Sequence, residues 1–160
     1  MYILKYLCNG FDIGPKINNM LTVSYVFKVI NMKKRATFEC HRLKGLLRFQ
    51  EISENLCYAS IHPDNNIIEP LGQHFIRRLP SMNFMIHDKN RNLCFIYNTK
   101  EYKVINSQNI RIPDVSENEK LYQDLWKMFF KTIAIKERTN PKCQMQFMPK
   151  KYWKDLIEEP

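Results

Sequence analysis

The segment His41–Glu51 reads His-Arg-Leu-Lys-Gly-Leu-Leu-Arg-Phe-Gln-Glu, and the periodicity of the chain changes within it. The residues before Gly45 continue a helical pattern, whereas those after it alternate, with Leu47 and Phe49 on one face and Arg48 on the other. Glycine is the residue most often found just past a helix end. The segment therefore predicts a long helix that stops at Gly45 and a first strand that begins there.

Upstream of this joint, residues 22–44 have the period of an amphipathic helix. Four apolar residues recur at the i, i+3, i+4, i+7 spacing of a buried stripe, namely Val23, Val26, Phe27 and Ile30. Three basic residues recur every seven positions and share another face, namely Lys28, Arg35 and Arg42. A solvated helix face usually explains such charges, but Glu39 is the only acid in this segment. Binding to phosphates and ordinary solvation therefore explain this basic face equally well.

Downstream, alternating runs bounded by turn-forming residues predict four further strands, over residues 56–61, 82–87, 93–97 and 101–105. Sequential strands with short connections pair antiparallel. A middle helix has four apolar residues at the spacing of a buried face, namely Ile68, Leu71, Phe75 and Leu79, and Pro80 ends it.

A C-terminal helix over residues 121–135 follows a capping box, in which Ser116 stands three residues before Glu119. Its apolar residues form a continuous stripe that we expect to be core, namely Tyr122, Leu125, Trp126, Phe129 and Ile133. We therefore expect an α+β fold, in which about five short antiparallel strands pack against a long basic N-terminal helix, a middle helix and a C-terminal amphipathic helix.

The composition predicts one folded domain over residues 1–160, with a hydrophobic fraction of 44% and an aromatic fraction of 12%. No run approaches the roughly 18 apolar residues of a membrane span. The apolar start is too short for a signal peptide and Lys5 interrupts it. We therefore expect a cytoplasmic protein without a membrane partner. The five cysteines are dispersed without a C-x-x-C pair, so we expect reduced thiols, no metal and no cofactor.

Positive charge is concentrated at the start of the chain. The formal net charge is +9, and residues 1–50 alone carry nine basic and two acidic side chains. Residues 51–115 are balanced, with seven of each sign. A basic end of this kind points to a polyanion such as DNA, RNA or an acidic membrane surface.

Two clusters are candidates for nucleic-acid binding. The first surrounds the Gly45 joint, where guanidinium groups match phosphate oxygens and a glycine allows close approach; it comprises His41, Arg42, Lys44 and Arg48. Lys44 could equally be a charge that complements the helix dipole, and Arg48 could equally be an ordinary surface residue.

The second cluster, residues 144–154, alternates lysines with aromatic residues, as a surface that binds along a nucleic-acid strand does. In it we assign binding to Lys150 and Lys151, and anchoring of the tail to Trp153.

Histidines are the candidates for acid–base chemistry. They are His41, His74 and His87, although a partly buried structural role explains His41 better. His87 and Asp88 are adjacent on a predicted strand and point to opposite faces, which argues against a dyad. The sequence has no Gly-rich dinucleotide loop, P-loop, zincin motif, Gly-x-Ser-x-Gly elbow or calcium loop.

Several segments together resemble one family over nearly the whole chain. They are His41–Gly45, Leu46–Glu51, Pro70 with His74 and Phe75, Ile86–Asp88, Lys131–Ile135 with Asn140 and Pro141, and Gln146–Trp153. The bacterial family that they resemble is labelled as probable DNA metabolism proteins. Its members are encoded beside a radical-SAM protein assigned to DNA modification or repair, and related domains are fused to uracil-DNA-glycosylase-like domains.

This resemblance implies a domain of unknown biochemical function, and it supplies no catalytic residues. Members usually have a further N-terminal segment. A chain that starts with the short helical run Tyr2–Asn9, which we expect to stop at Gly10, is therefore expected to be the C-terminal portion of that longer architecture.

Three functional hypotheses follow. The first is a DNA-associated accessory protein in repair or modification, which binds phosphates through its basic helix and first strand. The second is an enzyme acting on a nucleic-acid base or backbone, with histidines as acid–base groups. The third is a protein-interaction module whose partner is the radical-SAM protein.

Overall fold

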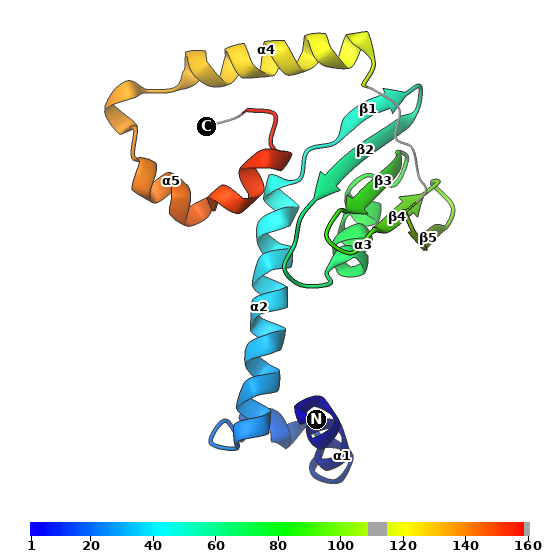
Figure 1. Ribbon diagram of the computed structural model, residues 1–160, viewed down its shortest axis with the longest axis vertical. Helices are drawn as coiled ribbons and strands as arrows, with labels where there is room; N and C mark the ends of the chain where they lie inside the picture. The colour runs from blue at the N-terminus through cyan, green and yellow to red at the C-terminus, as the bar shows by residue number, and fades with distance from the viewer. Residues whose placement is uncertain (109–114, 159–160) are drawn as a thin grey trace.

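The computed structural model describes residues 1–108 and 115–158, apart from the side chain at position 136, and has the predicted α+β class (Figure 1). The elements in chain order are α1 (Tyr2–Ile13), η1 (Gly14–Asn19), α2 (Ser24–Leu46), β1 (Gln50–Ser53), β2 (Leu56–Ile61), α3 (Ile68–Arg78), β3 (Asn83–Asp88), β4 (Leu93–Tyr97), β5 (Tyr102–Asn106), α4 (Glu117–Ile133), η2 (Lys136–Arg138), α5 (Pro141–Phe147) and η3 (Lys150–Asp155).

The five strands form one mixed sheet in the order β1-β2-β3-β4-β5. Three neighbouring pairs are antiparallel as predicted, but β2 and β3 are parallel, with Leu56 beside Asn83 and Ile61 beside Asp88. The expectation of an all-antiparallel sheet is therefore wrong for this pair. The reason is that α3 carries the chain back along the sheet, and a strand–helix–strand crossover produces a parallel pair.

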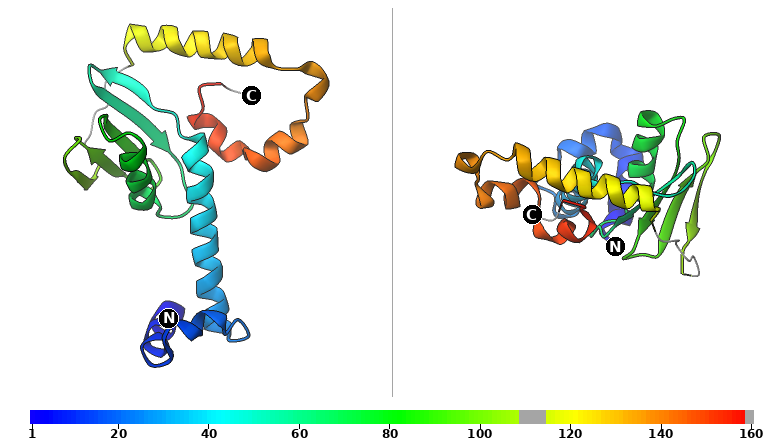
Figure 2. Two further views of the ribbon diagram at one scale, coloured as in Figure 1. Left: turned by 180° about the vertical axis from the view of Figure 1, so that it is seen from behind. Right: turned by 90° about the horizontal axis from the view of Figure 1, so that it is seen from above.

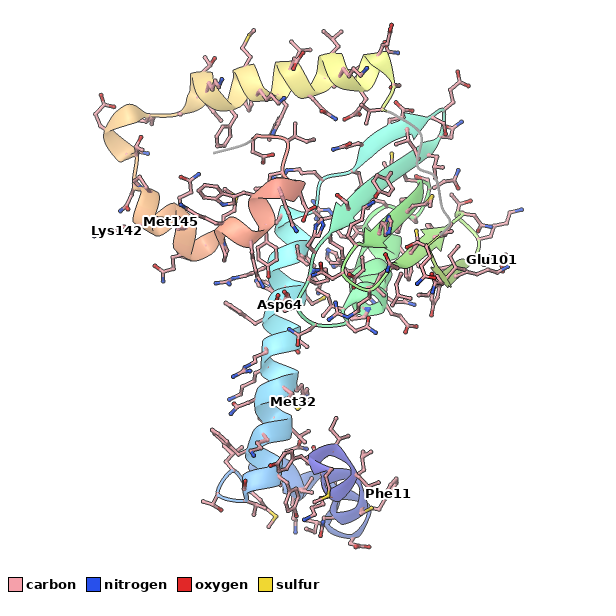
Figure 3. The ribbon with its side chains drawn as sticks, viewed as in Figure 1. Phe11, Met32, Asp64, Glu101, Lys142 and Met145 are labelled. Atoms are coloured by element: carbon pink, nitrogen blue, oxygen red, sulfur yellow. The ribbon has the colours of Figure 1, made fainter. Side chains whose placement is uncertain are left out.

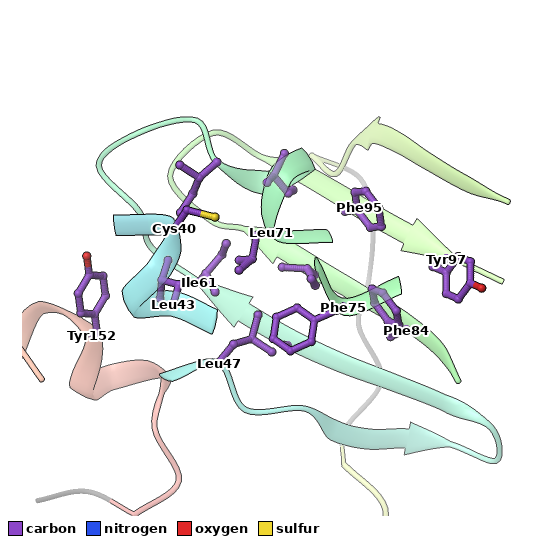
Figure 4. Packing of buried hydrophobic residues seen from close by; sticks show 14 residues of the cluster. Cys40, Leu43, Leu47, Ile61, Leu71, Phe75, Phe84, Phe95, Tyr97 and Tyr152 are labelled. Carbon is purple, nitrogen blue, oxygen red and sulfur yellow. The ribbon is translucent and has the colours of Figure 1, made fainter. Parts of the chain in front are cut away.

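The hydrophobic core lies where α3 and the C-terminal part of α2 cover one face of the sheet (Figure 4). Leu43 comes from α2, Leu71 and Phe75 from α3, and Phe84 and Phe95 from the central strands, and all are buried. The predicted buried face of α3 is thus confirmed at three of its four positions, since Ile68 is also buried and Leu79 is half-buried. This core fixes the end of α2 against the sheet.

The long helix α2 extends well beyond the core, and α1 packs against its far end (Figures 1 and 2). Of its predicted apolar stripe, Val26 is buried but Phe27 is 51% exposed. The helix runs one residue past Gly45, and α1 likewise runs past Gly10 to end at Gly14, which has a positive φ of 69°. Gly14 therefore caps α1 with a positive φ, which glycine adopts without the steric cost of a Cβ atom.

Helix α4 begins at the predicted capping box, in which the Ser116 hydroxyl accepts a hydrogen bond of 3.1 Å from the Glu119 amide. The expectation that its apolar stripe is core is wrong, because none of its residues is buried. Leu125 and Phe129, for example, are 51% and 52% exposed. An amphipathic pattern shows that a face favours burial, but it does not show what buries it. Within residues 1–108 and 115–158, no helix is long and apolar enough to cross a membrane.

Candidate functional site

The parallel pairing of β2 and β3 brings two loops together at one edge of the sheet. The Lys89 amide donates a 3.0 Å hydrogen bond to the Ile61 carbonyl, and the side chains of Asn90 and Arg91 both donate to the Pro63 carbonyl. Ligands of open α/β sheets bind outside the carboxyl ends of parallel strands. We call residues 61–65, residues 88–91 and η3, which packs beside them, the carboxyl edge.

The carboxylate of Glu39 joins α2 to this edge. It is buried and accepts hydrogen bonds from the backbone amides of Asp64 (2.9 Å) and Asn65 (2.8 Å). It also accepts from the Lys151 ammonium at 3.0 Å and the Tyr152 hydroxyl at 2.9 Å, both in η3. Burial alone would raise the pKa of Glu39, but the hydrogen bonds from Asp64, Asn65 and Lys151 lower it from 4.5 to about 2. Three separate parts of the chain therefore depend on one ionised side chain.

A hollow of about 180 Å³ opens beside this carboxylate. It is lined by Arg35, Phe38, Glu39, Arg42, Asp64, Asn65, Lys151 and Tyr152. The Arg42 guanidinium lies 4.3 Å from the centre of the Phe38 ring and donates to the Gln146 carbonyl of α5. Among the described residues, no carboxylate pairs with Arg35 or Arg42. Both cations are therefore available to an anion at the hollow.

Two of the predicted binding residues are engaged by carboxylates instead. Lys151 forms ion pairs with both Glu39 and Asp64. Asp64 lies beside α2, as Figure 3 shows. The hydrogen bonds that the Lys151 ammonium donates to these carboxylates outweigh burial and raise the pKa of Lys151. Arg48 donates from Nε to the Glu158 carboxylate at 3.1 Å, and this carboxylate is 5% exposed. Burial would raise the pKa of Glu158, but the Arg48 guanidinium beside it lowers this pKa.

The remaining predicted cations are spread along α2 and η3. Lys28 lies near the far end of α2, where its ammonium donates to the Tyr2 hydroxyl at 2.7 Å. Lys44 is half-buried in the last turn of α2, and the Lys150 ammonium lies 5.6 Å from the centre of the Trp153 ring. The structure thus gathers Arg35, Arg42 and Lys151 at one hollow, but it does not bring all seven residues onto one surface.

The three candidate histidines occupy different environments. His41 is exposed on α2, and His74 is half-buried against the Phe75 ring, where burial and then neighbouring cations lower its pKa. His87 is buried, and its two ring nitrogens lie 3.1 Å from the Tyr58 hydroxyl and 2.8 Å from the Ser107 hydroxyl. Burial lowers the pKa of His87.

The two adjacent strand residues His87 and Asp88 do not pair, as the strand alternation predicts. The Asp88 carboxylate instead accepts from the Arg91 guanidinium at 3.1 Å. The buried anchor of the tail is Tyr152, which is 1% exposed, whereas Trp153 is half-buried and donates its indole N–H to the Met148 carbonyl.

A histidine that the sequence did not single out has the strongest acid–base geometry. The Nδ1 atom of His62 lies 2.9 Å from the carboxylate of Asp155, and the Ser60 hydroxyl donates to the same carboxylate at 3.1 Å. Asp155 is 7% exposed and His62 is 24% exposed at the side chain. A carboxylate at Nδ1 favours the tautomer in which Nε2 can accept a proton. The partners are 93 positions apart, so no local spacing could have indicated the pair.

The described residues contain no cluster of three or more histidine, cysteine, aspartate or glutamate side chains placed to hold a metal ion. The fold and the carboxyl edge define a class of α+β domain in which a basic helix borders the ends of a parallel strand pair. The chain belongs to the family described as a domain of unknown function, DUF4130, which matches residues 1–158. No curated protein and no solved structure matches the chain.

Proposed function

We propose that this chain is a DNA-associated accessory protein in DNA repair or modification, which binds nucleic-acid phosphates at the hollow beside the carboxyl edge. The observation that carries the proposal is the placement of Arg35 and Arg42 on one face of α2, both free of carboxylate partners among the described residues. Guanidinium groups bind phosphate oxygens bidentately. The resemblance of the sequence supports a radical-SAM enzyme as the protein that this chain serves.

The charge distribution supports the same proposal. Lys33 and Lys34 are exposed beside Arg35, and Glu39, the only acid of α2, is buried and fully occupied. Arg42 lies seven positions after Arg35, so their Cα atoms lie roughly 10 Å apart along the helix. A net charge of +9 also favours association with a polyanion.

Replacing both arginines, Arg35→Ala and Arg42→Ala, is expected to weaken binding to duplex DNA. Each lost phosphate contact lowers the salt slope of log affinity by about 0.9, so two contacts change affinity by roughly 30-fold at about 0.15 M salt. Fluorescence anisotropy titrations over a range of salt concentrations measure both quantities.

The matched control removes the same two charges from the last turn of α3, with Arg77→Ala and Arg78→Ala. Both residues are exposed, and this turn lies at the opposite end of the parallel strands from the carboxyl edge. Equal losses of DNA affinity in the two double variants would mean that net charge alone drives binding. An unchanged salt slope in the α2 variant would refute the proposed site.

A second candidate function is an enzyme acting on a nucleic-acid base or backbone, and the His62–Asp155 pair favours it. General acid–base groups contribute roughly 100-fold to 10000-fold to rates. We expect His62→Gln to lower base release or strand cleavage at least about 100-fold while DNA affinity is retained. Sensitive glycosylase and nuclease assays with labelled oligonucleotides provide the measurement.

His41→Gln is the control for this experiment, because His41 is exposed and has no carboxylate partner among the described residues. A wild-type rate in His62→Gln, or equal losses in both variants, would rule out His62 as the acid–base group. A wild-type protein without turnover leaves the accessory role as the better description.

A further inference from the structure

Helix α4 presents an apolar surface that the rest of the described chain leaves exposed. Eight large apolar side chains of this helix are 37% or more exposed, namely Leu121, Tyr122, Leu125, Trp126, Met128, Phe129, Phe130 and Ile133. At its C-terminal end this surface continues into a groove of about 700 Å³ that α5 and the α4–α5 connection also line. Exposed apolar surfaces of this extent mark interaction sites.

The total exposed area is larger than that of a compact monomer of the same mass. A compact monomer of 19.3 kDa exposes about 8500 Å², whereas this chain exposes 11477 Å². The excess of about 3000 Å² is several times the roughly 800 Å² that each partner contributes to a standard interface. The open arrangement of α1 and α2 accounts for part of this excess, and the apolar part at α4 is large enough for a stable contact.

The charge of α4 is compatible with a second copy as the partner. The helix carries three acids (Glu117, Glu119 and Asp124) and three bases (Lys120, Lys127 and Lys131), so it is neutral although the chain as a whole carries +9. A neutral helix face allows two copies of a strongly basic protein to approach there. The neutral face of α4 does not attract a polyanion or an acidic protein electrostatically, whereas the basic helix α2 does.

We propose that α4 pairs with α4 of a second copy in an antiparallel arrangement about a two-fold axis near Leu125. A two-fold axis makes the same surface patch meet itself. Leu125 is the middle residue of α4, so antiparallel pairing about it places Leu121 opposite Phe129 and Tyr122 opposite Met128 of the other copy. It also places the acidic first half of each helix beside the basic second half of the other, and it opposes the two helix dipoles.

Analytical ultracentrifugation of the full chain from micromolar to about 100 µM tests the pairing. We expect a mass of twice 19.3 kDa for the wild type. Leu125→Glu places two carboxylates at the axis, and we expect it to raise the dissociation constant about 100-fold or more. Phe129→Glu should act in the same direction. Because both side chains are already exposed in the single chain, circular dichroism should show an unchanged helix content.

Phe11→Glu is the matched control, since Phe11 is 89% exposed on α1 and lies outside the proposed contact. It is expected to remain a dimer. A wild-type monomer at every concentration would overturn the proposal. A dimer that survives Leu125→Glu and Phe129→Glu would overturn it equally.

Cysteine cross-linking tests the direction of the helices. In a chain with the exposed Cys8 and Cys143 replaced by serine, Leu125→Cys should form a disulfide with its own copy under mild oxidation. Ile133→Cys should not, because antiparallel pairing separates the two copies of residue 133 by about 24 Å along the helix axis. A disulfide at position 133, or its absence at position 125, contradicts the antiparallel arrangement.

Discussion

Replacing Glu39 with glutamine is expected to lower the free energy of unfolding by about 3 kcal/mol. Glutamine fills the same volume but removes the charge, and its NH₂ group then faces groups that also donate hydrogen bonds. The amide keeps only one acceptor oxygen, so either the Lys151 and Tyr152 donors at Oε1 or the Asn65 donors at Oε2 lose theirs. The Lys151 ammonium also loses its buried charged partner, and breaking a buried charged pair costs about 3–5 kcal/mol. Urea denaturation of Glu39→Gln followed by circular dichroism measures the loss. Tyr152 should become exposed first, because Glu39 holds η3 in place.

The pH dependence of stability tests the contribution of Glu39 independently. The pKa of Glu39 is lowered to about 2 in the folded chain, from 4.5. Its contribution is therefore fully present above pH 4.5 and is lost as pH falls toward 2. Glu39→Gln should show a flatter curve than wild type in this window. The control is Glu54→Gln in the exposed β1–β2 turn, where we expect a change within about 0.5 kcal/mol. Wild-type stability in Glu39→Gln would contradict the role of Glu39.

The sequence predicted the secondary structure well because its signals are local. The predicted buried face of α3, the capping box at Ser116 and the strand from Leu93 to Tyr97 all rest on spacing within a few residues. The long basic helix was predicted for the same reason, and its last residue, Leu46, lies two positions beyond Lys44, the last residue of the predicted helix.

The arrangement of these elements could be predicted only in part. The sequence correctly placed a helix between β2 and β3, but the expectation of antiparallel strands did not take this helix into account. The direction of β3 depends on how α3 crosses the sheet. The stripe around Leu125 showed correctly that α4 has an apolar face. Whether such a face meets the same chain or another one is not encoded in its period.

For the candidate site, the helical repeat correctly placed Arg35 and Arg42 on one face of α2. The partners of the other groups are distant in sequence: Arg48 meets Glu158 across 110 positions, and Lys151 meets Glu39 across 112. The sequence therefore indicated which side chains are cationic, but only the fold shows which of them are neutralised. This distinction narrows the proposed binding residues from seven to those around one hollow.

Replacing Gly72 with alanine is expected to destabilise the fold by about 3 kcal/mol or more, because the position has no room for a methyl group. Gly72 lies on the buried face of α3, and a Cβ atom there would be 2.4 Å from Cε2 of Phe95. Phe95 is fully buried and its ring stacks on Phe84 and Tyr102. Overpacking of a rigid core typically costs about 1–3 kcal/mol, and more where the neighbour cannot move aside.

The same substitution at Gly45 should have the opposite sign, which makes it a stringent control. Gly45 is exposed in the last turn of α2, and nothing lies within 4 Å of the position its Cβ would occupy. Alanine there should stabilise the chain by about 0.5–1 kcal/mol, because glycine loses more conformational freedom in a helix. Thermal unfolding of both variants separates the two effects. A stable Gly72→Ala protein would mean that α3 does not pack on Phe95, and a destabilised Gly45→Ala protein would mean that α2 ends before Gly45, as the sequence pattern alone suggests.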